Sequence, residues 1–303
     1  MDGVLGTGGM GWVYRASHSL TGRVVALKVM REDQLTQERA IDRMMREASI
    51  LASVEHAGLP RFYECGILDD GRPWIAMELI DGVPLSAKMQ RDLVAPNVVM
   101  DFVHGVAGVL AAAHDRGVTH RDLKPENIFL TPEDPCYRVR VIDWGIAHHH
   151  TGSRFTNMNE AIGTPTYMSP EQARGGPTDG KCDVYGLGVV AYQALTGRPP
   201  FLGATSVEIL VQHLNKPAPA LAPRCPDAPY GLVELVEQML AKSHEERPSA
   251  EEVQVALTRL RMKTSARISA QHEIEDGVPV VMFGEQTATT AVIRAPHKSV
   301  AED

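Results

Sequence analysis

The chain has 303 residues, 44% of them hydrophobic, so it can form one large domain or two modest ones around a substantial core. Its net charge of −8 argues against nucleic acid or an anionic membrane surface as the main partner. The four cysteines are widely separated, no signal peptide opens the sequence and no run of about 18 apolar residues occurs, which favours a cytoplasmic protein without a membrane span.

The first motif is a glycine-rich segment near the N-terminus, where Gly6, Gly8 and Gly11 form the pattern G-x-G-x-x-G. Alone this pattern is weak, because it also opens dinucleotide-binding folds, in which a helix follows the third glycine. Here two strand-like runs, residues 12–16 and 24–29, follow instead and are joined by a turn. A glycine-tipped hairpin leaves backbone N–H groups open to phosphates, so the context favours a phosphate-binding hairpin.

Lys28 lies in the second strand-like run, among apolar residues. A lysine in such a place costs desolvation energy unless it meets an anion, which favours phosphate binding over a surface lysine that extends to water. From Thr36 to Ser53 apolar residues recur at helical spacing, and Glu47 falls on the inward side of this predicted helix. Glu38, nearer the start of the helix, is expected to be solvated.

Two more strands are predicted at residues 59–65 and 74–80, separated by a turn around Asp69-Asp70-Gly71. With the preceding strands and helix they would complete a small antiparallel sheet with one helix. Asp81-Gly82 then interrupts the pattern, which places the end of a first lobe near residue 80.

The second lobe opens with a strongly periodic helix pattern at residues 96–116, and residues 120–127 follow it with the string H-R-D-L-K-P-E-N. Asp122 can accept a proton from, or orient, an incoming hydroxyl, and Lys124 can neutralise charge on a transferring phosphoryl group. Asn127 offers an oxygen to a hard cation such as Mg²⁺. A surface turn with scattered charges is the alternative, but it does not account for the ordered string.

A short strand at residues 139–142 leads into Asp143-Trp144-Gly145. Together these motifs resemble those of protein kinases. The string at 120–127 is similar to the catalytic loop H-R-D-L-x-x-x-N, and Val25-Ala26-Leu27-Lys28 is similar to the V-A-I-K strand. Asp143-Trp144-Gly145 resembles D-F-G with tryptophan in place of phenylalanine. Between Leu5 and Arg261, seven motifs stand in the expected order, and their sequences most resemble those of bacterial Hanks-type serine/threonine kinases.

The resemblance implies a role for each matching residue. Catalytic roles are implied for Asp122, Lys124, Lys28 and Glu47, with Glu47 holding Lys28, and Mg²⁺ ligation for Asn127 and Asp143. Nucleotide binding is implied for Leu5, Gly6, Gly8, Gly11, Val13, Ala26, Lys28, Met77, Glu78, Ile80 and Phe129. Met77 would be the gatekeeper beside the adenine, whose edge the backbone of Glu78 and Ile80 would read.

Residues 146–163 form a polar stretch that resembles a kinase activation loop. Its three adjacent histidines, at 148–150, cannot easily converge on one metal ion and are expected to be solvated. We expect Thr156 to be the regulatory phosphorylation site, because Arg121 precedes the catalytic aspartate and could pair with a phosphate. The alternative sites are Thr151 and Ser153.

Residues 163–171 resemble the kinase segment that ends in A-P-E. Thr164 stands where serine/threonine kinases use a threonine to touch the catalytic aspartate and lysine, which indicates serine or threonine acceptors. The resemblance implies that Glu171 pairs with Arg247, and that Asp183 hydrogen-bonds the backbone of the catalytic loop as structural support.

Four further helices are predicted at residues 182–195, 206–214, 230–240 and 250–260, and Ser249 with Glu252 indicates a capping box for the last. Helical periodicity is lost from Thr264, so the tail is expected to be mostly disordered. Its threonines at 287, 289 and 290 could be phosphoacceptors read by a partner, with an inert linker as the alternative. About four residues precede the glycine-rich segment, so we expect a short first strand and an incomplete N-terminus.

We therefore predict an α+β, bilobal kinase-like fold with an N-lobe at 1–80, a C-lobe at 81–263 and a tail at 264–303. The predicted function is that of a non-specific serine/threonine protein kinase, which uses ATP with Mg²⁺ or Mn²⁺ and phosphorylates protein substrates. Autophosphorylation is expected, and a homodimer would serve it. The alternatives are a nucleotide-binding pseudokinase that acts as a scaffold and a kinase-like enzyme that acts on a small molecule.

Overall fold

The computed structural model describes residues 2–8, 11–32, 45, 48–131, 138–144 and 165–275, with the backbone alone described for residues 264–275. Contacts within the chain divide it into two units, Met1–Lys263 and Thr264–Asp303. The first unit contains every described element that carries a predicted site residue.

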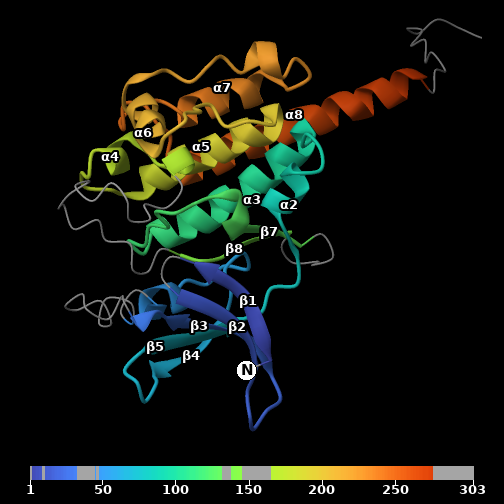
Figure 1. The fold of residues 1–303 in the computed structure, drawn as a ribbon. Coiled ribbons are helices and arrows are strands. Elements are labelled where there is room, and N and C mark those ends of the chain that lie inside the picture. Colours follow the sequence, from blue (N-terminus) through green and yellow to red (C-terminus); the bar gives the residue numbers. More distant parts are fainter. Residues whose placement is uncertain are drawn as a thin grey trace, which may run out of the picture. The chain divides into compact units, whose positions relative to one another are not determined.

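A five-stranded antiparallel sheet forms the N-terminal part of the first unit (Figure 1). Its spatial order is β1-β2-β3-β5-β4, with β1 (Gly3–Gly8), β2 (Gly11–Ser17), β3 (Val24–Met30), β4 (Phe62–Ile67) and β5 (Pro73–Glu78). Because side chains alternate along a strand, each face of the sheet carries its own apolar cluster. Ile75 belongs to the cluster on one face, and Val25 to the cluster on the other.

Gly11 is needed by the sheet itself. It pairs with Met30 in the β2–β3 register, and a Cβ atom at this position would overlap the carbonyl oxygen of Val29. The third glycine of the glycine-rich motif is therefore fixed by the close approach of two strands as well as by any ligand.

Between β3 and β4 the described residues 48–52 are helical, inside the helix predicted at 36–53. Ala48 and Leu51 of this segment are buried, at 4% and 1% exposure. The described part of the N-terminal lobe thus has the predicted composition of one antiparallel sheet and a helical segment beside it.

The C-terminal part of the unit is mainly helical (Figure 1). Its longer helices are α3 (Pro96–His114), α5 (Gly180–Thr196), α6 (Ser206–Asn215), α7 (Tyr230–Met239) and α8 (Ala250–Glu275). Its short elements are α2 (Leu85–Met89), α4 (Pro170–Ala173) and the 3₁₀ turns η2 (Pro125–Asn127), η3 (Pro165–Tyr167) and η4 (Ala222–Arg224). A small sheet joins β6 (Val83–Pro84), β7 (Ile128–Leu130) and β8 (Val139–Val141) in that order.

Helices α3 and α5 pack against each other at the centre of the core. Val99, Val103, Val106 and Leu110 recur at helical spacing on α3 and have no exposed surface. Among the described residues, α3 is the one helix long and apolar enough to cross a bilayer, but most of it is buried inside this unit, as the core helix of a folded domain would be.

The sequence signals for helix ends are matched by the structure. Ser249 N donates to Glu252 Oε2 over 2.7 Å and Glu252 N donates to Ser249 Oγ over 3.1 Å, which confirms the predicted capping box at the start of α8. Gly117 and Gly197 follow α3 and α5 with φ angles of 74° and 76°, a conformation that favours glycine.

The last helix was predicted to end too early, whereas the predicted start of the tail at residue 264 coincides with the boundary between the two units. Helix α8 continues to Glu275, whereas the sequence pattern ended the helix near Leu260 and treated residue 264 as the start of a mostly disordered tail. Residues 264–275 contain no glycine or proline, so the helix can continue after its apolar stripe has ended; the next such residue is Gly277. Residues 276–303 lie outside the described residues, and their disorder stays a prediction.

Candidate active site

The residues of the predicted catalytic loop lie between α3 and β7, and η2 closes the loop. The ammonium nitrogen of Lys124 lies 2.6 Å from Asp122 Oδ2, and the two side chains are 25% and 26% exposed. Asn127, which is 4% exposed, donates a hydrogen bond from Nδ2 to the backbone carbonyl of Asp122 over 2.8 Å. The loop therefore presents a carboxylate beside a cation, both partly exposed to solvent. The buried Asn127 amide stabilises the loop backbone beneath them.

The buried carboxylate of Asp183, in the first turn of α5, holds the loop in place. Its oxygens accept hydrogen bonds from the backbone N–H groups of His120 and Arg121, each over 2.7 Å, and His114 Nε2 lies 2.8 Å from Oδ2. Burial would raise the pKa of this carboxyl, but the hydrogen bond and charge of His114, the charge of His120 and the hydrogen bond from its backbone outweigh burial and lower it. The predicted bond between Asp183 and the catalytic-loop backbone is confirmed.

Arg121 takes the left-handed backbone conformation, with a φ angle of 66°. A non-glycine residue rarely adopts this conformation, and its cost must be met by surrounding contacts. Asp183 supplies one such contact at the Arg121 N–H group. Gln172 supplies another, because its Nε2 donates to the Arg121 carbonyl over 2.7 Å.

Acid should weaken the unit through Asp183. Its folded-state pKa lies below the ordinary value of 3.8, so its contribution to the free energy of unfolding is present above that value and is lost as pH falls through the folded-state pKa. Asp183→Asn replaces an accepting oxygen by a donor and should lower the free energy of unfolding at neutral pH by about 2–3 kcal/mol.

Thermal unfolding of the parent and Asp183→Asn, followed from neutral pH into acid, measures this contribution. The difference between the two unfolding midpoints should be largest at neutral pH and shrink below the ordinary carboxyl pKa. A difference that stays constant down to strong acid would show that the carboxylate charge of Asp183 does not stabilise the fold.

Lys28 on β3 and Asp143, just after β8, form an ion pair. Burial would raise the pKa of Asp143, but the charge and hydrogen bond of Lys28 and the charges of His120 and Lys124 outweigh it and lower that pKa. Asp143 therefore stays an ionised carboxylate at neutral pH. Glu47, the residue predicted to hold Lys28, lies outside the described residues.

Trp144 is buried, with 2% of its surface exposed. Its indole Nε1 donates to the carbonyl of Val141 over 3.0 Å, and the centres of the Trp144 and His120 rings are 4.9 Å apart. His120 Nε2 lies 3.0 Å from the carbonyl of Ile142. Tryptophan at this position thus fills the space with its N–H group satisfied, a bond that the more usual phenylalanine could not make.

The residues predicted to contact the nucleotide are brought partly together by the sheet register. Val13 pairs with Lys28 and Ala26 pairs with Met77, which puts these four side chains on one face of the sheet. Leu5 lies at an irregularity in the β1–β2 register and is 50% exposed. The other predicted nucleotide contacts are placed on β1 (Gly6 and Gly8), on β2 (Gly11), at the end of β5 (Glu78), just after it (Ile80) and on β7 (Phe129).

Sequence reasoning missed Gln172 and His114 as supports of the loop. Gln172 also completes a capping box with Ser169, in which each side chain bonds the other residue's backbone (2.9 and 3.3 Å). The S-x-x-Q spacing at the start of α4 is a signal that could have identified this cap. No local pattern connects His114, at the end of α3, with Asp183.

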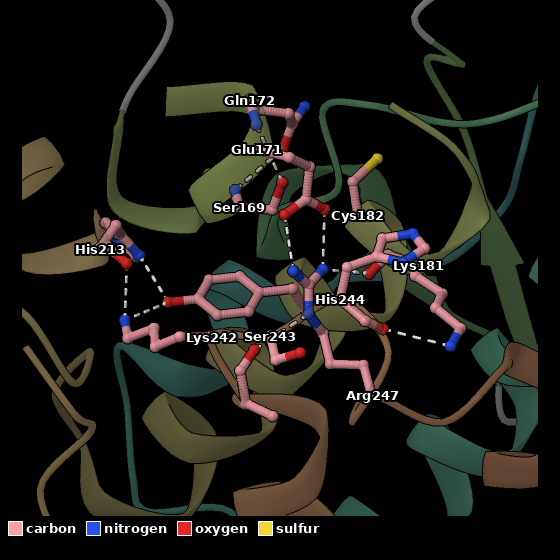
Figure 2. A network of polar contacts seen from close by, with 12 residues as sticks. Ser169, Glu171, Gln172, Lys181, Cys182, His213, Lys242, Ser243, His244 and Arg247 are labelled. Atoms are coloured by element: carbon pink, nitrogen blue, oxygen red, sulfur yellow. Dashed lines mark hydrogen bonds and ion pairs between the residues drawn. The ribbon is translucent and has the colours of Figure 1, made fainter. Parts of the chain in front are cut away.

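The predicted pairing of Glu171 with Arg247 is confirmed (Figure 2). Two nearly parallel hydrogen bonds of 2.7 and 2.6 Å join the guanidinium to the carboxylate. Arg247, 2% exposed, also donates to the carbonyls of Ala241 and Lys181 over 3.0 and 2.9 Å. The pair therefore fastens α4 to the start of α5 and to the loop after α7.

The donor set of the loop fits a magnesium ion. Asn127 Nδ2 is engaged with the Asp122 carbonyl, which leaves the amide oxygen for a cation, and the ionised Asp143 supplies a carboxylate. The Ile142 N–H group donates to the Asn127 carbonyl over 2.9 Å, so the two segments that bear these candidate ligands are joined. Within the described residues no group of three or more acidic, histidine or cysteine side chains forms a metal site, but Mg²⁺ bound with substrate phosphates does not need one.

Comparison with known proteins places this geometry in context. Residues 1–256 match the protein kinase domain family. The chain is 36% identical over 285 residues to the serine/threonine-protein kinase pkn3 of Myxococcus xanthus, covering 89% of this chain and 52% of that protein. It is 34% identical over 240 residues to the serine/threonine-protein kinase PrkC of Bacillus subtilis, covering 79% of this chain and 36% of that protein.

Among solved structures, the kinase domain of Mycobacterium tuberculosis PknI superposes with a TM-score of 0.66 at 28% identity, covering 85% of this chain and 93% of that domain. The likeness extends over both parts of the first unit, which bears out the predicted bilobal α+β fold. The chain spans about half, or less, of the length of the curated relatives it matches.

Proposed function

The chain belongs to the protein kinase family, and on this premise we propose that it transfers the γ-phosphoryl group of ATP to serine and threonine hydroxyl groups of proteins. The observation that carries the proposal is the geometry of the catalytic loop. The Asp122 carboxylate lies beside the Lys124 ammonium, and the Asn127 side chain donates a hydrogen bond to the backbone carbonyl of Asp122. The relatives' names as serine/threonine-protein kinases support the same activity.

In this proposal Asp122 orients the acceptor hydroxyl and takes its proton as the oxygen attacks the γ-phosphorus. The bond between that phosphorus and the leaving oxygen of ADP breaks in the same displacement. Lys124, whose ammonium lies 2.6 Å from Asp122, neutralises charge on the phosphoryl group as it moves. The hydrogen bonds from the loop backbone to the buried Asp183 carboxylate hold the loop in place, which preserves the alignment that phosphoryl transfer requires.

Lys28 would align the nucleotide phosphates, with Glu47 as its proposed partner on the neighbouring helix. Support for this role comes from the sheet register, which puts Lys28 on the same face as Val13, Ala26 and Met77. The adenine would lie against this face, read at its edge by the backbone after β5, with the glycine-rich β1–β2 hairpin over the phosphates.

Asn127 and Asp143 would hold the divalent cation, Mg²⁺ or in its place Mn²⁺. When bound, the cation screens the charge of the β- and γ-phosphates and lowers the cost of bringing an oxygen nucleophile to them. The lowered pKa of Asp143 keeps its carboxylate ionised for this role at neutral pH.

The alternative of a nucleotide-binding pseudokinase scaffold has less support. Such proteins usually lack the strand lysine or one of the key loop residues, whereas Lys28, Asp122, Asn127 and Asp143 are all present. A small-molecule kinase is disfavoured by the buried Glu171–Arg247 pair, because in protein kinases this pair braces the region on which a peptide docks.

The partners of the proposed enzyme are proteins with serine or threonine acceptors, and a second copy of this chain would serve for autophosphorylation. The proposed site of action is the cytoplasm, where ATP is available. Thr156 remains the proposed regulatory phosphorylation site, although it lies outside the described residues.

Transfer to a mixture of unstructured proteins, with ATP and Mg²⁺ supplied, tests the proposed function. Mapping the modified residues by fragmentation mass spectrometry should give phosphoserine and phosphothreonine without phosphotyrosine. Phosphotyrosine as the main product, or a modified metabolite with no modified protein, would contradict the proposal.

A further inference from the structure

A buried polar network that the proposed chemistry does not use lies behind the 3₁₀ turn η3. It consists of Tyr185 on α5, His213 on α6 and Lys242 just after α7, three residues that are far apart in sequence. Figure 2 shows the His213 and Lys242 side chains close together. Lys242 Nζ lies 3.0 Å from the Tyr185 hydroxyl, which lies 2.9 Å from His213 Nδ1. At the other side of the imidazole, His213 Nε2 lies 3.0 Å from the carbonyl of Thr166, in η3.

The chemistry of the groups fixes the direction of every hydrogen bond in this network. The Thr166 carbonyl can only accept, so His213 Nε2 must carry the hydrogen, and Nδ1 of a neutral imidazole must then accept. The Tyr185 hydroxyl therefore donates to Nδ1, and its oxygen accepts from Lys242. Burial, helped by the charge of Lys242, lowers the pKa of His213 to about 4, so the imidazole is neutral at physiological pH.

Lys242 fastens the network to the end of α6. Besides the Tyr185 hydroxyl, its ammonium donates to the carbonyls of His213 over 2.8 Å and Gln212 over 3.4 Å, in the last turn of the helix. It also lies 4.2 Å from the centre of the Phe201 ring. All three ammonium hydrogens thus have acceptors, and neither the α6 end nor the tyrosine can shift without breaking one of them.

The turn that the network holds borders the catalytic loop. At Gly186 on α5, a Cβ atom would lie 3.3 Å from the Tyr167 carbonyl oxygen and 3.5 Å from the Leu123 carbonyl oxygen. Leu123 stands between Asp122 and Lys124, so η3 and the catalytic loop meet across a single glycine. The Tyr167 hydroxyl also donates to Gln193 Oε1 over 2.7 Å, which fixes the next residue of the turn to α5.

We propose that His213, backed by Tyr185 and Lys242, is a positioning residue for protein substrates, because it fixes the η3 turn beside Asp122 where the acceptor segment must run. The inference rests on the proposed kinase function and adds a determinant of acceptor binding to it. None of the described contacts joins these three side chains to Lys28 or Asp143, so ATP binding should not depend on them.

Two substitutions of His213 distinguish the contact that its Nδ1 atom makes from the contact that its Nε2 atom makes. The shorter amide in His213→Asn can still accept from Tyr185 but cannot reach Thr166, whereas the longer amide in His213→Gln can donate to the Thr166 carbonyl. With a protein acceptor, His213→Asn should raise KM about five- to tenfold, the effect of one lost hydrogen bond, with kcat and the KM for ATP close to parental values. His213→Gln should restore most of the acceptor KM.

Tyr185→Phe provides a milder variant in case the asparagine protein folds poorly, because it removes only the hydroxyl that orients the imidazole. It should also raise the acceptor KM, by a smaller factor than His213→Asn does. An acceptor KM that does not change in any of the variants, or that rises together with the KM for ATP, would overturn the proposal. So would equal effects of asparagine and glutamine at position 213.

A readout that needs no activity keeps this inference separate from the proposed function. Hydrogen exchange at the Met168 amide, which donates to the Pro165 carbonyl over 3.2 Å, should speed up in His213→Asn and return toward the parental rate in His213→Gln. A parent that transfers no phosphate would defeat the kinase proposal alone. Exchange rates that are equal in all three proteins would defeat the positioning role, whatever the activity.

Discussion

Asp122→Asn is expected to reduce the rate of phosphoryl transfer by about 10²–10⁴-fold while the affinity for ATP stays nearly unchanged. Asparagine has the size of aspartate but cannot take a proton from the acceptor hydroxyl. The support of the loop should survive the change, because Asn127 bonds the backbone carbonyl of residue 122 and not its side chain. Transfer kinetics beside nucleotide titration of the same preparation would measure both quantities.

Asp143→Asn is the matched control for this prediction, because it makes the same chemical change at the proposed metal ligand. It should weaken both transfer and the binding of ATP in the presence of Mg²⁺, and it also removes the ion pair with Lys28. If Asp122→Asn retained parental turnover, the assignment of Asp122 as the group that orients and deprotonates the acceptor would be wrong.

Arg247→Ala is expected to lower the free energy of unfolding of this unit by about 3–5 kcal/mol. The loss is large because Glu171 would remain largely buried without a cation, and because the carbonyls of Ala241 and Lys181 would lose a donor. Burial alone would raise the pKa of Glu171, but the hydrogen bonds and charge of Arg247 outweigh burial and lower it. The charge of Glu171 therefore depends on its partner.

A double-mutant cycle isolates the pair from the other contacts of Arg247. Glu171→Gln, Arg247→Lys and their combination should show a favourable coupling, because lysine keeps the charge but cannot form the two parallel bonds. Chemical denaturation followed by circular dichroism gives the free energies. Unfolding midpoints that do not respond to Arg247→Ala would show that the ion pair does not stabilise the fold.

Much of the site could be predicted because its residues occur in ordered strings. Asp122, Lys124 and Asn127 share one loop, so a single string of residues predicts them together. Val13, Ala26 and Met77 were connected through the resemblance, because the pairing of β2, β3 and β5 that puts them on one face joins strands that are distant in sequence. The partners Glu171 and Arg247 are distant in sequence, and only the resemblance to a family connected them.

What could not be predicted depends on contacts between distant elements. The Tyr185–His213–Lys242 network joins three elements, and none of the three residues stands in a local pattern that signals the others. The same holds for His114 and Asp183, which meet only because α3 packs against α5. The end of α8 was misjudged for another reason: loss of apolar periodicity ends the buried stripe of a helix but not the helix itself.

Phosphoryl transfer by this chain, in the proposed function, depends on Asp122. The most direct test is the intact mass of the purified protein after incubation with ATP and Mg²⁺, beside Asp122→Asn treated in the same way. We predict that the parent gains whole phosphate groups and that the variant gains none. Bound ATP with no mass gain in the parent would contradict the proposed kinase function, and equal gains in both proteins would contradict the role of Asp122.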